Sequence, residues 1–225
     1  MSKLKNNDDN LKKFKTLKKE KNESIGDYAV RVIEYNIINM FLPPGIFISE
    51  KIISDMLDIS RTPVREAFAR LEKANFIEIY PQKASRVSLI DIDIIDETNF
   101  IRRTLEKEII KIVCDKCSNQ ELKLLGDNVY QYRKNMKNDD LYKLLDIDNK
   151  FHKILFLVEN KKLAYSIVKD SMKHINRARI FNIIEMDKNK TLTNRNRTLK
   201  EHQDIFHAIK EKNSKKAVSL IETHL

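Results

Sequence analysis

The sequence predicts a mainly α-helical protein with two domains, for three reasons. Its 225 residues suffice for two hydrophobic cores, because single domains commonly contain about 100–150 residues. It has only 3 glycines and 4 prolines, and its 41% hydrophobic and 34% charged residues are typical of helices joined by short loops. Apolar residues recur at helical spacing through most of the chain, whereas strand-like runs occur only in a short stretch before residue 90.

Residues 1–23 are polar, rich in lysine and weakly periodic, so we expect a flexible basic arm. This segment lacks the apolar core of a secretory signal, and no run in the chain approaches the roughly 20 apolar residues that a membrane helix needs. We therefore expect a cytoplasmic protein without a membrane partner.

The first two predicted helices lie between residue 25 and a turn at residues 58–60. Apolar positions at helical spacing from residue 25 to Met40 predict a first helix, which ends before the Pro43-Pro44-Gly45 sequence. Ser49 is placed to cap a short second helix that leads into the turn.

A third helix follows this turn, with Thr62 as the expected N-cap and Pro63 as its first-turn residue. Two β-prone runs between residues 76 and 89 flank a polar turn and predict a hairpin. Three helices followed by a small hairpin form the outline of a winged helix-turn-helix, which we assign to residues 24–90.

Residues 91–225 contain no comparable strand signals and predict an all-α helical bundle. The helical repeats lie over about residues 101–112, 122–136, 140–158, 161–180, 195–212 and 214–225. Cys114 and Cys117 have the spacing of half a zinc site or a redox pair. A second pair is lacking and the two fall at a helix end, so small buried side chains are the favoured interpretation.

The net charge of +10 suggests a nucleic-acid partner, but its distribution weakens that argument. Residues 24–90 contain 8 basic and 8 acidic side chains, so the predicted DNA-binding domain is neutral overall. The case for DNA therefore depends on where individual cations lie. Arg61 and Arg65 flank the start of the third helix, where arginine can bridge O6 and N7 of a guanine in the major groove. The alternative is an ordinary solvated helix face.

Several short motifs resemble the DNA-binding domain of the GntR family of bacterial regulators. They are Pro43-Pro44-Gly45, Ile48-Ser49-Glu50-Lys51, Ser60-Arg61-Thr62-Pro63-Val64-Arg65-Glu66-Ala67 and Leu71-Glu72. The resemblance implies that a double-stranded operator is bound and that the wing tip enters the minor groove. It implies DNA contacts by Lys51, Arg61, Thr62, Arg65, Lys83 and Arg86. Two departures are Lys51, where the family commonly has arginine, and Ala84, where it usually has glycine, because alanine tolerates a positive φ poorly.

Four ionisable residues interrupt apolar helical stripes in the C-terminal half. Asp148 and His152 lie one turn apart among leucines, while His202 and His224 occupy similar positions further along. Buried ionisable groups are costly unless they are paired. One interpretation is a set of separate core histidines, and the other is a divalent metal bound by three imidazoles and a carboxylate.

The same half resembles the FCD effector domain of the FadR subfamily. The matching segments are Arg102 to Glu106, Asp148 to His152, Glu201 to Ile209 and His224-Leu225. In metal-binding members the positions of Asp148, His152, His202 and His224 hold the metal, and an arginine at the position of Arg102 lines the same cavity. The resemblance therefore implies a divalent ion, with zinc expected and nickel or manganese as alternatives, and effector binding by Arg102.

These expectations combine into a transcriptional regulator, most simply a repressor, whose DNA affinity responds to a small organic acid bound at the metal. Similar regulators are homodimers, which implies a pseudo-palindromic operator. The alternatives are an acyl-CoA-type or metal-only sensor, a helical metalloenzyme with a DNA-binding module, and a DNA-binding protein with an inert bundle. We expect no enzymatic activity, because no general base is apparent beside the four candidate ligands.

Overall fold

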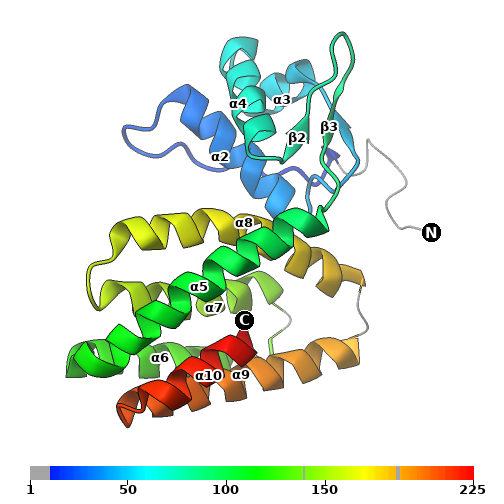
Figure 1. Ribbon diagram of the computed structural model, residues 1–225. Coiled ribbons are helices and arrows are strands. Elements are labelled where there is room, and N and C mark those ends of the chain that lie inside the picture. Colours follow the sequence, from blue (N-terminus) through cyan, green and yellow to red (C-terminus); the bar gives the residue numbers. More distant parts are fainter. Residues whose placement is uncertain (1–10, 139, 186–187) are drawn as a thin grey trace. The chain divides into compact units, whose positions relative to one another are not determined.

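The computed structural model describes residues 11–138, 140–185 and 188–225, and it confirms a mainly α-helical fold (Figure 1). The chain divides into two compact units. One extends to Asp91 and includes Arg177–Phe181, and the other comprises Ile92–Asn176 and Asn182–Leu225. Within the described residues, no helix is both long enough and apolar enough to span a membrane.

The first unit combines three helices with a small antiparallel sheet. Its elements are α2 (Ile25–Ile38), β1 (Phe47–Ile48), α3 (Glu50–Leu57), α4 (Arg61–Lys73), β2 (Ile77–Glu78) and β3 (Ser85–Val87). The strand order is β1-β3-β2, and Ile77 of β2 lies opposite Val87 of β3. The hairpin of β2 and β3 is the expected wing. Strand β1 was not expected, because two residues are too few to show strand alternation.

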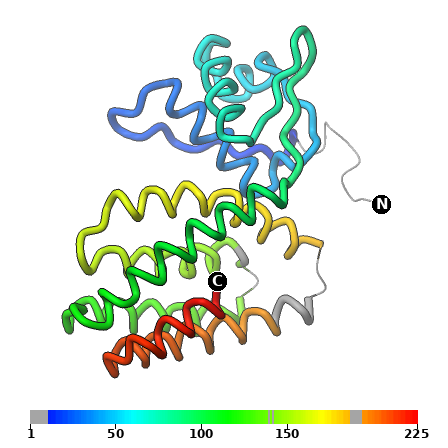
Figure 2. Tube along the Cα trace, viewed as in Figure 1, coloured from blue at the N-terminus to red at the C-terminus, as the bar shows by residue number. Residues whose placement is uncertain are grey.

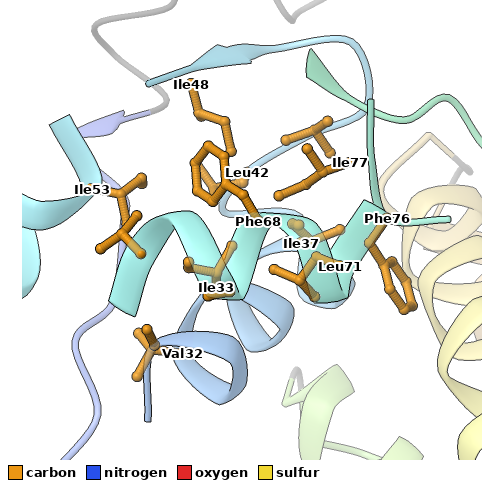
Figure 3. Close-up of a cluster of buried hydrophobic side chains, with 14 of the residues drawn as sticks. Val32, Ile33, Ile37, Leu42, Ile48, Ile53, Phe68, Leu71, Phe76 and Ile77 are labelled. Carbon is orange, nitrogen blue, oxygen red and sulfur yellow. The ribbon is translucent and has the colours of Figure 1, made fainter. Parts of the chain in front are cut away.

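The core of this unit forms where α2 and α4 pack together, with the sheet closing one side. Ile33 and Ile37 from α2 meet Phe68 and Leu71 from α4, and all four are almost completely buried (Figure 3). Burial of apolar side chains is the main source of stability in such a small core. The core therefore holds α4 by one face and leaves its opposite face exposed.

Helix α4 begins earlier than the sequence analysis predicted. Its N-cap is Ser60, whose backbone is extended, and Arg61 is the first helical residue. Thr62 is thus inside the first turn and does not cap the helix. Pro63 is tolerated as the third helical residue because the first N–H groups of a helix have no intrahelical partner. The preceding turn is tight because Asp58 has a left-handed backbone, with φ of 52°.

Residues 11–23 pack against the core of the first unit, so this part of the segment differs from the flexible arm that its composition suggested. Leu11 is buried, and Phe14 and Leu17 contact the same core. The Asn36 side chain accepts from the Lys15 N–H at 2.7 Å and donates to the Lys15 carbonyl at 2.9 Å. The segment consequently runs alongside α2 (Figure 2). The first ten residues of the expected arm lie outside the described residues.

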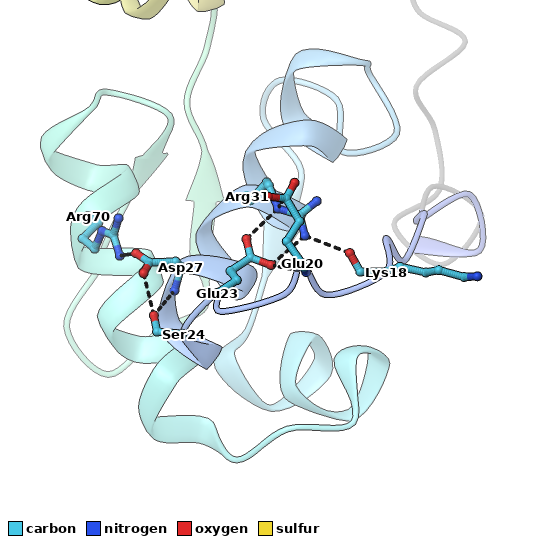
Figure 4. A network of polar contacts seen from close by, with 7 residues as sticks. All are labelled: Lys18, Glu20, Glu23, Ser24, Asp27, Arg31 and Arg70. Atoms are coloured by element: carbon cyan, nitrogen blue, oxygen red, sulfur yellow. Dashed lines mark hydrogen bonds and ion pairs between the residues drawn. The ribbon is translucent and has the colours of Figure 1, made fainter.

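A second set of polar contacts holds the end of this segment (Figure 4). Arg31 of α2 binds both carboxylate oxygens of Glu23, at 2.6 and 2.8 Å, and donates to the Lys18 carbonyl at 2.9 Å. The hydrogen bond from Arg31 lowers the pKa of Glu23 to about 2. Apolar and polar contacts together order a stretch whose composition alone suggested disorder.

The second unit is a helical bundle. Its helices are α5 (Ile92–Lys116), α6 (Asn119–Asn135), α7 (Leu141–Leu157), α8 (Lys162–Glu185), α9 (Lys188–Lys210) and α10 (Ser214–His224). Helix α5 packs against α7, α9 and α10, and α6 packs against α7 and α9. Apolar residues such as Val113, Phe151 and Ile205 fill the space between them. The start of α6 is fixed by a capping box between Ser118 and Glu121.

We expect Asn36→Ala to release residues 11–23 from α2. The Lys15 N–H and carbonyl would lose their partners, which should lower the free energy of unfolding by about 1–3 kcal/mol. Urea unfolding measures this loss, and limited trypsin digestion should cut faster at the lysines of the segment. Asn39→Ala is the control, because the side chain of Asn39, the C-cap residue of α2, donates to the Tyr35 carbonyl of that helix. Equal trypsin sensitivity of both variants and the parent would contradict this role for Asn36.

Candidate metal centre and nucleic-acid interface

The four ionisable residues that interrupt the apolar stripes come together inside the second unit. Asp148 and His152 project from adjacent turns of α7, His202 from α9 and His224 from the last turn of α10. Asp148 and His152 are each 3% exposed, His202 is fully buried, and the His224 side chain is 2% exposed. Each offers one ligand atom, and these atoms all lie within 4.8 Å of one another.

The shortest distances in this cluster match those between ligands of a single metal ion. His224 Nε2 lies 3.1 Å from His152 Nε2 and 3.2 Å from His202 Nε2. His202 Nε2 lies 3.3 Å from Asp148 Oδ1. Ligand atoms about 2.0–2.1 Å from a tetrahedral zinc ion are about 3.3 Å apart. The donor set and its spacing therefore fit a divalent cation.

Aromatic packing orients the central imidazole. The ring of Phe151 stacks on that of His202, with centroids 4.1 Å apart and planes inclined by 10°. Phe151 is itself fully buried in the bundle core. Since a packed ring cannot turn freely, the direction of the His202 nitrogens is set by the core.

Two carboxylates that the sequence analysis did not assign surround the cluster. Glu106 Oε2 lies 2.5 Å from Nδ1 of His152, and Glu201 Oε2 lies 2.8 Å from Nδ1 of His224. Helical periodicity offers a signal for Glu106 alone, because it lies one turn after Arg102 and one turn before Ile110 on α5. Glu201 lies beside the buried face of α9 and carries no such signal.

Burial and neighbouring charges keep the two closest groups in defined protonation states. Burial lowers the pKa of His152 to about 3, although Glu106 acts in the opposite direction. Burial alone would raise the pKa of Glu106, but the guanidinium of Arg102 and the hydrogen bond from His152 lower it to about 2. At neutral pH His152 is thus a neutral imidazole, the form that can bind a metal.

Arg102 lies beside this cluster, with 3% of its surface exposed. Its Nε donates to Glu106 Oε1 at 2.8 Å. Its Nη2 is buried and has no hydrogen-bond partner among the described residues. A buried guanidinium nitrogen without a partner is costly, and an anionic ligand would satisfy it.

The cysteine pair is not part of this cluster. Burial raises the pKa of Cys114 to about 11, and it also raises the pKa of Cys117. Both thiols are free and remain protonated at neutral pH, whereas a metal ligand or redox nucleophile must be a thiolate.

The residues expected to contact DNA lie on the surface of the first unit. Arg61, Thr62 and Arg65 are exposed along the first turns of α4, and Lys51 is exposed in the first turn of α3. The exposed face of α4 therefore carries two arginines next to free backbone N–H groups, an arrangement that suits phosphate and base edges.

Acidic residues hold two of the expected DNA-binding arginines. Arg65 makes a bidentate pair with Glu50 of α3, with Nε–Oε1 and Nη2–Oε2 distances of 3.0 Å. Arg86 of β3 binds Glu78 of β2 at 2.6 Å. Neither carboxylate was singled out from the sequence, because the partners are 15 and 8 residues apart in the chain. Both pairs limit the directions in which the arginines can point.

Ala84 introduces no backbone strain at the tip of the wing. The left-handed residue in this turn is Gln82, with φ of 60°, and Ala84 does not have a positive φ. The N–H of Lys83 donates to the Tyr80 carbonyl at 3.2 Å, and the Lys83 side chain is exposed at the tip. Replacement of the usual glycine by alanine therefore imposes no backbone penalty at position 84.

Comparison with known proteins matches both halves of the chain. Residues 28–87 match the family of bacterial regulatory proteins named gntR, and residues 97–225 match the FCD domain. The transcriptional repressor RspR of Escherichia coli K12 is 25% identical over 203 residues, which cover 90% of this chain and 86% of RspR. The regulator YdhC of Bacillus subtilis is 25% identical over 189 residues, covering 84% and 82% of the two chains.

Solved structures have the same fold. Escherichia coli McbR/YncC superposes with a TM-score of 0.74 at 17% identity, over 90% of this chain and 93% of that one. A GntR regulator of Rhodococcus superposes with a TM-score of 0.70 at 21% identity, over 90% and 94%. From the two family matches together, the chain belongs to the GntR family of transcriptional regulators and carries an FCD domain in its C-terminal half.

Proposed function

We propose that this regulator binds a divalent metal and a small carboxylate effector in residues 91–225, and that this binding controls operator recognition by residues 24–90. The observation that carries the proposal is the convergence of Asp148, His152, His202 and His224 on one point inside the bundle. Buried charges are costly in a core, so such a set is better explained by a bound cation than by packing alone.

Zinc is the ion we favour, with nickel or manganese as alternatives, because imidazole and carboxylate ligands suit several first-row metals. Three histidines and one aspartate leave a coordination position open on any ion that accepts more than four ligands. A carboxylate bound there could use its second oxygen to satisfy the buried Nη2 of Arg102. These features support our proposal that the chain resembles the metal-binding members of the FadR subfamily.

For operator binding, we propose that α4 enters the major groove by its N-terminal end. Arg61, Thr62 and Arg65 lie at that end, and Lys51 is available to a phosphate from α3. Lys83 and Arg86 of the wing extend the same function toward the minor groove. The domain has no excess positive charge, so specificity must come from these few side chains.

We further propose a homodimer that binds a two-fold operator, since each chain offers one recognition helix and paired half-sites match that symmetry. We favour repression over activation of transcription, because the relative RspR is named a repressor. The effector would bind one arrangement of the bundle better than another and shift the population that binds DNA. Operator binding requires access to the chromosome, and for that reason we propose a cytoplasmic location.

Replacing Arg65 by alanine should weaken operator binding about 10- to 100-fold and relax the preference at the base it contacts, since one bidentate contact contributes about 1–3 kcal/mol. Gel-shift titration on the operator and on single-base variants would measure both effects. Arg70→Ala is the matched control, because Arg70 is exposed on the same helix but pairs with Asp27 of α2. If the Arg65 and Arg70 variants bound the operator alike, the assignment of α4 as the recognition helix would be wrong.

Metal analysis of the untagged protein should find about one divalent ion per chain. Added Zn²⁺ should raise the Tm of chelator-treated protein, because binding to the folded state alone stabilises it. His152→Ala should abolish both effects, whereas His207→Ala should abolish neither, since His207 is exposed on α9. A parent protein that bound no ion and showed no shift with Zn²⁺ would overturn the metal proposal.

Acid should destabilise the metal-free protein. The pKa of His152 falls from 6.5 to about 3 on folding, so its contribution is complete above pH 6.5 and is lost as the pH falls toward 3. The pKa of Glu106 falls from 4.5 to about 2, which adds a loss of the same sign below pH 4.5. Urea midpoints measured from pH 7 to pH 4 should therefore decrease, and His152→Gln should flatten the slope while His207→Gln leaves it unchanged. A His152→Gln slope as steep as the parent's would contradict this assignment.

A further inference from the structure

We propose that Glu106 and Glu201 are positioning residues of the metal centre, and that each holds one histidine in the tautomer whose Nε2 lone pair faces the other ligands. The inference rests on the proposed function, because it concerns how that site is prepared for its ion. It assigns a role to two carboxylates, one on α5 and one on α9, that are not among the four candidate ligands.

Glu106 offers the stronger case. It is completely buried, and its two oxygens are divided between two partners, Arg102 Nε at 2.8 Å and His152 Nδ1 at 2.5 Å. Its ion pair with the Arg102 guanidinium is that of a carboxylate, and a carboxylate only accepts hydrogen bonds. The hydrogen in the contact with His152 must therefore be on Nδ1, which leaves Nε2 as the lone-pair atom of the neutral ring.

Glu201 makes the equivalent contact at the other side of the cluster. Its Oε2 lies 2.8 Å from Nδ1 of His224, and its Oε1 lies 3.5 Å from Nε of Arg197. Glu201 directly precedes His202 on α9, so one helix supplies a candidate ligand and also reaches across to the histidine of α10. By the same reasoning, the hydrogen in this contact is on Nδ1 of His224, which leaves Nε2 to face the other ligands.

The two carboxylates together create an arrangement that favours a cation. With both Nδ1 atoms protonated, the Nε2 lone pairs of His152 and His224 face each other at 3.1 Å with no hydrogen of their own between them. Two acceptors at this distance repel, whereas a positive ion between them binds both. Carboxylates that orient histidines in this way are typical of protein metal sites, where they also raise the basicity of the ligand.

Glu106 and Glu201 differ in their other contacts. Glu106 is one helical turn from Arg102, so it joins the proposed effector arginine to a proposed metal ligand in one hydrogen-bonded chain. The Glu201 side chain is 22% exposed, and within the described residues it pairs with His224 and with the surface residue Arg197. Loss of Glu201 should therefore affect the metal alone, whereas loss of Glu106 should also change the response to an added carboxylate.

The tautomers can be read directly by ¹⁵N NMR of histidine side chains in chelator-treated protein at neutral pH. We expect His152 and His224 to carry their hydrogen on Nδ1, and we expect Glu201→Gln to move His224 toward the Nε2–H form, because an amide can donate as well as accept. A His224 ring that is already Nε2–H in the parent, or one that is unchanged in Glu201→Gln, would overturn the inference. This measurement does not depend on metal binding.

Zn²⁺ affinity gives the second readout, measured by competition with a chelator. Glu201→Gln should weaken Zn²⁺ binding about 10- to 100-fold with little change in the Tm of the metal-free protein, as expected for a residue that orients a ligand. Glu106→Gln should weaken it at least as much. Glu108→Gln is the control, since Glu108 is exposed on α5 and pairs with Lys111.

These outcomes separate the two proposals. If the parent binds no metal, the proposed function fails, and the tautomers still test whether the carboxylates hold the rings. If the parent binds Zn²⁺ and Glu201→Gln binds it as tightly, the positioning role fails while the metal site stands. Should Glu106→Gln not fold, the more exposed Glu201 still decides the inference.

Discussion

The bundle depends on how its buried ionisable groups satisfy one another. Arg102 and Glu106 form an ion pair in which both side chains are almost completely buried, and Glu106 also holds His152. Apolar residues of similar size would stabilise a core at least as well, because removing charges from water costs several kcal/mol for each ion. The ion pair is therefore better understood through its effect on His152 than through stability, and α7, α9 and α10 pack against the helix that carries it.

At the surface of the first unit, ion pairs also restrict ionisable side chains. Its acidic and basic residues are equal in number, yet Glu50 and Glu78 each hold an arginine expected to contact DNA. Such exposed pairs contribute little to stability. They limit the orientations of long side chains, which reduces the entropy lost when those side chains meet a base or phosphate. A neutral domain can thus remain selective, because it offers few freely placed cations to DNA of any sequence.

Helical periodicity predicted the parts of this molecule that depend on local sequence. It predicted the fold class and the burial of Asp148 and His152, because buried positions on a helix repeat every three to four residues. It could not show that α7, α9 and α10 bring their ligands to one point, nor that Glu201 reaches His224 from a neighbouring helix. Those are facts of tertiary packing. The ordering of residues 11–23 was missed for the same reason, since its apolar contacts lie on α2 and the core beyond it.

The distance in sequence between the groups of the candidate site has a consequence for regulation. Glu106 and His224 are 118 positions apart, and the groups of the candidate site come from four helices, α5, α7, α9 and α10. An ion held by such residues would join helices that otherwise contact one another only through side-chain packing. Its binding free energy would therefore stabilise the arrangement of the bundle that binds it. An anion that contacts Arg102 would act on the same arrangement through Glu106. Metal and effector would then change each other's affinity by the same factor, as linkage requires.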